Sequence, residues 1–293
     1  MTSQMCLSIP KSEDRILSIS INGHRLNFCL LTNLNASILA LMPHHTFKKN
    51  FIKEAIFRLD FSEPVTDKIH KKLKDRLGIS ADMYSEENIE ESNIYVEGKR
   101  KARLTTKIVG TQAIYQLANG RVTLTHESLI VVVNTYESFG VFSKLIIELL
   151  DSFEGLVKHD IEYQRVGMRY INRIQVQKVS KNDDWMNFIE PTFRCDYAKL
   201  GTIDGLSVRR SMTTNYFSSG DFIVKLISGI WNESYPGLIK DHSFIIDIDC
   251  FIESMKVDGT YVKQNLQRMN DFAVTLFLSA ASKKLQDLMR KSS

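Results

Sequence analysis

The stretch YQRVGMRYINRI, residues 163–174, alternates between polar and apolar side chains and is typical of a β-strand. Its even-numbered positions are mostly apolar and predict a face turned toward a core. Its odd-numbered positions include Arg165, Arg169 and Arg173, which lie about 13 Å apart at about 3.3 Å per residue. The stretch therefore predicts a sheet with one buried face and one face that carries arginines.

Two explanations of the arginine face remain open. Arginines in a row could follow a phosphate backbone or clamp an anion, because each guanidinium can bind an oxyanion through two hydrogen bonds. Alternatively, they form cross-strand pairs with opposite charges, because Glu54, Arg58 and Asp60 occupy the equivalent face of the strand predicted at 51–61 and neighbouring opposite charges stabilise a sheet. Both explanations can hold for different arginines.

The chain before residue 163 predicts a strand, a helix, three strands and a second helix. The first helix starts near Thr66, and the second carries an apolar stripe from Phe139 to Phe153. Asn119-Gly120 is a hairpin signal between the first two of the three strands. These three strands are predicted at 111–117, 121–127 and 129–135.

Opposite charges are segregated ahead of these three strands. Residues 82–97 contain six acidic and no basic residues, whereas 99–107 contain five basic and no acidic residues. Such runs of like charge favour a solvated loop or a hairpin tip. The basic run, KRKARLTTK, could form a mobile basic arm.

The second half repeats the order of the first. A strand at 163–176 is followed by a short helix at 183–191, strands at 206–217, 221–231 and 243–252, and a helix from about 260 to 290.

An internal duplication would produce this repeated order, and α+β without duplication is the alternative. We predict two pseudo-repeated strand-helix-three-strand-helix units that form antiparallel sheet, joined through their opening or neighbouring strands. The long helices would pack on one face and leave the other open and concave. The expected regions are an N-terminal extension at 1–46, a first α+β half at 47–158 and a second at 159–293.

Composition indicates a globular protein of the cytoplasm. The 293 residues are 43% hydrophobic, and 38 basic against 34 acidic residues give a formal charge of +4, too small an excess to indicate a dedicated nucleic-acid binder. The four cysteines lie far apart and are expected to be reduced thiols. Three asparagines interrupt the apolar window at 26–42, which predicts a buried strand and helix and neither a membrane anchor nor a signal peptide.

Five stretches resemble a sporadically distributed prokaryotic family of uncharacterised proteins. They are FKKNFIKEAIFRLDFSEP, YQRVGMRYINRI, WMNFIEPTF, SFIIDIDCFIE and NDFAVTLFLSAASKKLQDLM, and together they span about 47–290. The resemblance implies a shared fold and a patchy gene distribution of the kind associated with antiviral defence islands. It supplies no catalytic residues.

Other residues could extend a binding surface or form a metal site. Arg209, Arg210 and Lys225 add positive charge to the predicted strands, and Tyr115, Tyr216 and Trp231 could stack on bases or pack in the core. Asp247 and Asp249 share one strand face, where they could hold Mg²⁺ with Glu54 or Asp60 as third ligand. They could equally form salt bridges with the arginines.

The absence of enzyme motifs leads to two hypotheses. The sequence contains no P-loop, GxGxxG, GxSxG or HExxH motif, and the adjacent His44 and His45 point opposite ways on an extended chain. We therefore expect a cofactor-free binding or regulatory module that recognises nucleic acid, DNA or RNA, or a partner protein from the same operon. Arg165, Arg169, Arg173, Arg209 and Lys225 would be its contacts. The alternative is a Mg²⁺-dependent nuclease or phosphodiesterase that uses Asp247 and Asp249.

Overall fold

The computed structural model describes residues 16–21, 24–29, 47, 49–97, 101–157, 161–176, 179, 182–194 and 208–291. The chain divides into two compact units, Met1–Thr46 and Phe47–Ser293. In the first unit, β1 (Ile16–Ile21) pairs antiparallel with β2 (His24–Cys29). The helix expected before residue 42 and the pair His44-His45 lie outside the described residues.

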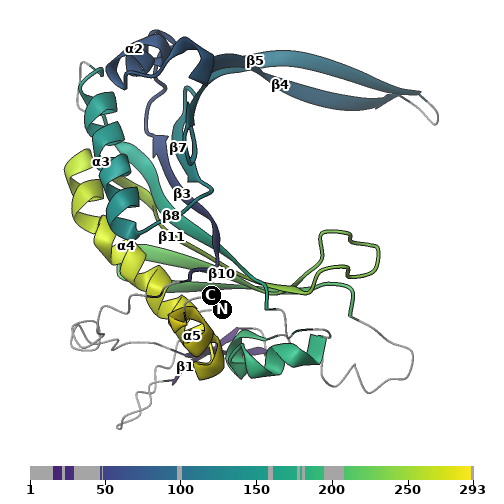
Figure 1. The fold of residues 1–293 in the computed structure, drawn as a ribbon. Coiled ribbons are helices and arrows are strands. Elements are labelled where there is room, and N and C mark those ends of the chain that lie inside the picture. Colours follow the sequence, from purple (N-terminus) through teal and green to yellow (C-terminus); the bar gives the residue numbers. More distant parts are fainter. Residues whose placement is uncertain are drawn as a thin grey trace, which may run out of the picture. The chain divides into compact units, whose positions relative to one another are not determined.

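The second unit contains one nine-stranded antiparallel sheet with helices (Figure 1). This confirms the predicted α+β class. The strands are β3 (Ile52–Phe61), β4 (Tyr84–Glu97), β5 (Lys101–Leu117), β6 (Gly120–Leu124), β7 (Ser128–Val133), β8 (Tyr163–Ile174), β9 (Ser211–Ser219), β10 (Phe222–Trp231) and β11 (Ser243–Val257). The helices are α2 (Lys68–Arg76), α3 (Phe139–Glu154), α4 (Gly259–Ala280) and α5 (Lys283–Arg290), with short 3-10 turns at Ala81–Met83, Asn182–Asn187 and Pro191–Phe193.

The two opening strands of the predicted halves meet inside this sheet. Its order is β4-β5-β6-β7-β3-β8-β11-β10-β9, so β8 is hydrogen-bonded to β3 on one side and to β11 on the other. Both pairings are antiparallel, and they align Phe57, Met168 and Cys250 in one row across the three strands. Side chains of a given face are therefore neighbours across all three strands.

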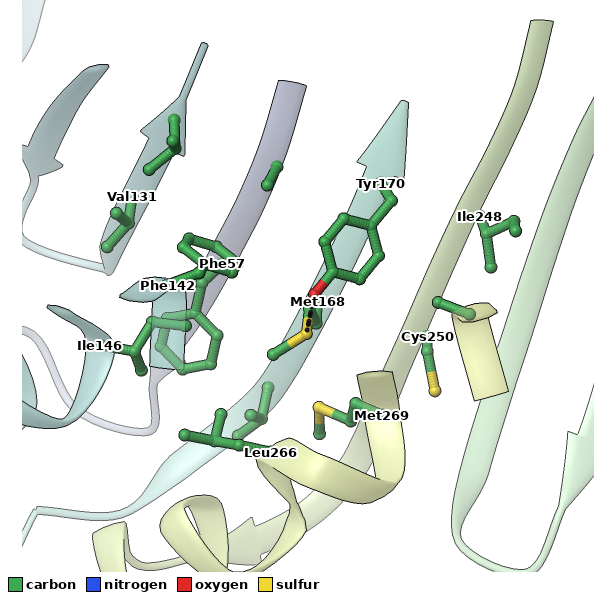
Figure 2. Packing of buried hydrophobic residues seen from close by; sticks show 14 of the residues in the cluster. Phe57, Val131, Phe142, Ile146, Met168, Tyr170, Ile248, Cys250, Leu266 and Met269 are labelled. Carbon is green, nitrogen blue, oxygen red and sulfur yellow. Dashed lines mark hydrogen bonds between the residues drawn. The ribbon is translucent and has the colours of Figure 1, made fainter. Parts of the chain in front are cut away.

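The core forms on the face of β8 that the apolar alternation predicts. Val166, Met168 and Ile174 are fully buried there. Figure 2 shows Phe142 of α3 and Leu266 of α4 pointing toward these strands. Further ring contacts tie the helices to the sheet, with centroid distances of 5.0 Å for Phe61–Phe153, 6.4 Å for Phe142–Tyr170 and 5.6 Å for Phe222–Phe272.

The charged run expected as a loop or hairpin tip is built as a long hairpin of β4 and β5. The two strands pair from Tyr84–Tyr115 to Glu97–Lys101, with an irregularity near Ile89. Only the segment 113–117 of β5 also pairs with β6, so the rest of the hairpin is a two-stranded ribbon (Figure 1). The predicted strand at 111–117 is therefore only the last part of β5.

The final helix predicted from 260 to 290 is broken into α4 and α5. Ala281 forms an isolated antiparallel bridge with Ile189, which removes it from the helix. Ser282 then starts α5 by accepting a hydrogen bond from the backbone N–H of Leu285. In the described residues no helix is long and apolar enough to cross a membrane.

Helix α2 starts one residue later than the position predicted for Thr66, at the N-cap Asp67. The Asp67 side chain does not cap the helix. Its Oδ1 instead accepts a hydrogen bond from Thr111 Oγ1 at 2.8 Å and lies 2.5 Å from His126 Nε2. These hydrogen bonds lower the pKa of Asp67 and attach α2 to β5 and to the turn between β6 and β7.

Replacing Phe57 tests the position of the core. Phe57 is 1% exposed, so Phe57→Ala is expected to lower the free energy of unfolding by about 3–5 kcal/mol. Val274→Ala is the control, because Val274 on α4 is 42% exposed, and its effect should stay within about 0.5 kcal/mol. Urea unfolding measures both, and equal effects would contradict the assignment of Phe57 to the core.

Candidate functional site

The register of β8 and β11 brings arginines and carboxylates together on the face opposite the core, which we call the polar face. Arg165 lies opposite Glu253, and Arg169 lies opposite Asp249. Asp247 is two residues further along β11 and so faces the same way. Side chains diagonal to one another across an antiparallel pair are within reach of a long side chain such as arginine. We call these five residues the arginine–carboxylate ladder.

Arg169 is held by Asp247. Its Nε donates to Oδ1 at 2.7 Å, and its Nη2 donates to Oδ2 at 2.6 Å. Two parallel charge-assisted bonds are the strong form of this interaction. They raise the pKa of Arg169 against the opposing effect of its burial. The side chain of Asp247 is only 8% exposed, and both of its oxygens are occupied by the guanidinium.

Arg165 joins two carboxylates and an aromatic ring. Its Nη2 donates to Asp249 Oδ2 at 3.2 Å, and its Nη1 donates to Glu253 Oε1. Its Cζ lies 3.9 Å from the centroid of the Phe251 ring. Gly167 lies opposite Phe251 and allows the two strands to approach closely, because a Cβ there would lie 3.1 Å from the Cβ of Phe251. Arg165 is thus fixed by charge and by stacking.

Asp249 is a half-buried carboxylate of the ladder whose pKa is raised. Burial raises its pKa, and the adjacent carboxylate of Asp247 acts in the same direction. Arg165, Arg169 and Lys225 oppose the increase without overcoming it. Lys225 lies directly opposite Asp249 on β10. Lys225, which the sequence predicts as an anion contact, therefore also stabilises the ionised form of Asp249.

The remaining predicted arginines lie in two different settings. Arg173 Nη1 donates to Glu233 Oε1, in the segment after β10, and its side chain is 18% exposed. Arg209 is exposed in the segment before β9. The ladder therefore does not include either residue.

The predicted metal ligands lie on the polar face but are engaged by arginines. Asp247 is bound to Arg169, and Asp249 to Arg165. Asp60, one of the expected third ligands, accepts a hydrogen bond from Arg58 Nε at 2.7 Å. The described part of the chain contains no group of three His, Cys, Asp or Glu side chains that could hold a metal ion. A metal site at these aspartates stays a prediction.

A hollow in the surface lies at the Arg165 end of the ladder. It has a volume of about 240 Å³ and is lined by Asp60, Gln164, Arg165 and Glu253. Pockets for small molecules usually measure about 300–1,000 Å³ and are mostly apolar. This hollow is smaller and polar, so it gives no support to a small-molecule substrate site.

The predicted aromatic platforms divide between core and surface. Tyr115 is fully buried, and its hydroxyl donates to the carbonyl oxygen of His70 at 2.8 Å, which makes it a packing residue. Tyr216 is 63% exposed, with Lys225 Nζ 5.8 Å from its ring centroid. Trp231 is partly covered by Arg210, whose Cζ lies 4.1 Å from a ring centroid of the indole.

Three residues of the site were missed by the sequence reasoning. Phe251 and Glu253 continue the alternation of Asp247 and Asp249 along β11, so the period of two could have identified them. Glu233 lies beyond the end of β10, and its pairing with Arg173 leaves no pattern in the sequence.

The sequence matches no protein-family model and no curated protein. The function is therefore inferred from the fold and from the residues of the polar face.

The raised pKa of Asp249 predicts a pH-dependent stability. Unfolded, an aspartate has a pKa of about 3.9, so the folded protein binds this proton more tightly than the unfolded chain. The resulting stability is complete below about pH 4 and is lost as the pH rises through the folded-state pKa. Compared with Asp249→Asn, the wild type should therefore lose stability between pH 4 and pH 7.

Urea unfolding of both proteins at the two pH values measures this difference. Glu253→Gln, which removes a more exposed carboxylate bonded to the same arginine, controls for the loss of one charge. If the free energies of unfolding of wild type and Asp249→Asn differ by the same amount at pH 4 and at pH 7, the prediction is contradicted.

Proposed function

We propose that the protein is a non-enzymatic, cytoplasmic binding module of a multi-protein system, and that its polar face receives a partner protein. The observation that carries the proposal is the pairing of Arg165, Arg169 and Arg173 with carboxylates. Charges of both signs held in fixed positions orient and select a partner, because a partner whose charges do not match them brings like charges together.

The balance of charge favours a protein over a polyanion at this face. The ladder contains two arginines and three carboxylates, so a phosphate backbone would meet no excess of positive charge there. Affinity for nucleic acid depends mainly on basic residues that are free to neutralise phosphates. Arginines already bonded to aspartate or glutamate supply little of this affinity.

The remainder of the polar face has the mixed composition of a protein interface. Half-buried isoleucines such as Ile56, Ile171 and Ile227 stand between the charged pairs. Arginine and aromatic residues are enriched in protein–protein interfaces, and interfaces are about as apolar as the rest of a protein surface. Arg165, which packs on the ring of Phe251, is an arginine–aromatic pair of this kind near the middle of the sheet.

The arrangement of the unit is consistent with an internal duplication, which we include in the proposal. In each half the opening strand, β3 or β8, is followed in the sheet by the last strand of that half and then by the preceding strands in reverse order. In the proposed arrangement α3 and α4 both cover the core face, so that the polar face is available to a partner. The contacts of α4 with β8 and β11, and of α3 with α4, support it.

The competing hypothesis, a Mg²⁺-dependent nuclease, has less support. A carboxylate whose two oxygens bind a guanidinium must release it before it can bind Mg²⁺, and this applies to Asp247. The sequence resemblance described above extends the leading proposal to anti-phage defence, with a partner protein encoded in the same operon.

Replacing Ile227 by lysine tests the partner surface. The new charge stands on the polar face and should abolish co-elution with a partner, because a buried unpaired charge is costly at an interface. Val274→Lys is the matched control, since it makes the same change at an exposed position of α4. The measurement is size-exclusion chromatography after co-expression with the products of the neighbouring genes. Failure of the wild type to co-elute, or equal behaviour of both variants, would contradict the proposal.

A further inference from the structure

Two neighbouring arginines beside the polar face lack, in the described part of the chain, the carboxylate partner that Arg165, Arg169 and Arg173 have. Arg210 packs on Trp231, with its Cζ 4.1 Å from a ring centroid of the indole, and lies 5.9 Å from the ring centroid of Tyr235. Among the residues that the structure describes, neither Arg210 nor the adjacent Arg209 forms an ion pair, and both are exposed. We call Arg209, Arg210, Trp231 and Tyr235 the aromatic corner.

The pairing of β9 with β10 positions this corner. Ser211 and Ile230 form the last pair of the two strands, so Arg210 and Trp231 follow directly opposite each other. Gly229 allows the ends of β9 and β10 to approach each other closely. Its φ is +151°, and a Cβ there would lie only 2.0 Å from the carbonyl oxygen of Ser211. The stack of Arg210 on Trp231 is therefore set by the backbone of the sheet edge.

An arginine held on an aromatic ring is prepared to bind an oxyanion. The ring contacts the flat face of the guanidinium and leaves the N–H donors at its edge free. Glu233, two residues after Trp231 in the chain, is bonded to Arg173. Arg210 can therefore bind an oxyanion, whereas Arg165 and Arg169 are already bonded to carboxylates.

The corner also offers exposed aromatic and apolar side chains. Tyr235 is 57% exposed, and Leu238 nearby in the chain is 66% exposed. Aromatic rings next to free arginines are the combination that binds single-stranded nucleic acid, because every base can stack and every linkage carries a phosphate. Two arginines are too few for the row of phosphates along a duplex.

We propose that the aromatic corner is a binding site for a short segment of single-stranded nucleic acid. Arg209 and Arg210 receive its phosphates, and Tyr235 stacks on a base. The site goes beyond the proposed partner surface, since it uses none of the ladder residues.

Fluorescence anisotropy of labelled 20-nucleotide oligothymidine tests the site with the full chain at low salt. Arg210→Ala and Tyr235→Ala should each raise Kd about tenfold, because base stacking and a phosphate contact are lost separately. Arg268→Ala is the matched control: Arg268 is also an exposed arginine on an aromatic ring, 4.6 Å from the centroid of Phe222, and its loss should change Kd less than twofold. Thermal unfolding of each variant verifies its fold.

The salt dependence provides an independent readout. Two phosphate contacts predict a slope of log K against log salt concentration of about −1.4 for the wild type and about −0.7 for Arg210→Ala. Stacking on the corner should also change the fluorescence of Trp231.

Three results would overturn the proposal: no binding by the wild type, equal loss in Arg210→Ala and Arg268→Ala, or equal affinity for a duplex of the same length. Competition by polyglutamate as strong as by unlabelled oligothymidine would also overturn it, because the corner would then be a general carboxylate site. Ile227→Lys should leave oligothymidine binding unchanged, which separates this site from the partner surface.

Discussion

The structure depends on the antiparallel pairing of β8 with β3 on one side and β11 on the other. A strand paired on both edges has no freedom to slip by one residue, since a slip would move every apolar side chain to the opposite face. The same register that buries Met168 between Phe57 and Cys250 also places Arg169 beside the aspartates of β11. Core and ladder are therefore two results of one constraint.

The ladder explains how a sheet can hold five charged side chains side by side. Half-buried charges are costly when they are alone, and each one here has a partner of the opposite sign within hydrogen-bonding distance. Such a pair costs desolvation energy when it forms, so it is weak evidence for stability. In the function proposed above, the ladder would define which chemical groups a partner must present.

Period-two alternation was sufficient to predict β8, its core face and the position of its arginines. It also placed Asp247 and Asp249 on one face of β11, although it left both metal binding and salt bridging open. The choice between them depends on the neighbouring strand, which is 78 residues away in the chain for Arg169 and Asp247. No local pattern can specify such a pairing.

Other features were missed for different physical reasons. The facing segments of β4 and β5 that form the ribbon are rich in charged residues, so they lack the apolar period by which strands are recognised. The break between α4 and α5 is set by the bridge from Ala281 to Ile189, while the apolar stripe continues through it. Arg210 and Trp231 were both noted as candidates, but their contact depends on how β9 and β10 end.

Asp247 binds Arg169 through two hydrogen bonds and leaves it unavailable to a ligand. A double-mutant cycle with Arg169→Met, Asp247→Leu and the combined variant, followed by urea unfolding, tests this most directly. We expect a coupling energy of about 1–3 kcal/mol, with the double variant at least as stable as either single variant, because apolar replacement of a whole pair leaves no unpaired charge. Additive effects of the two substitutions would show that the pair contributes nothing and would contradict the account.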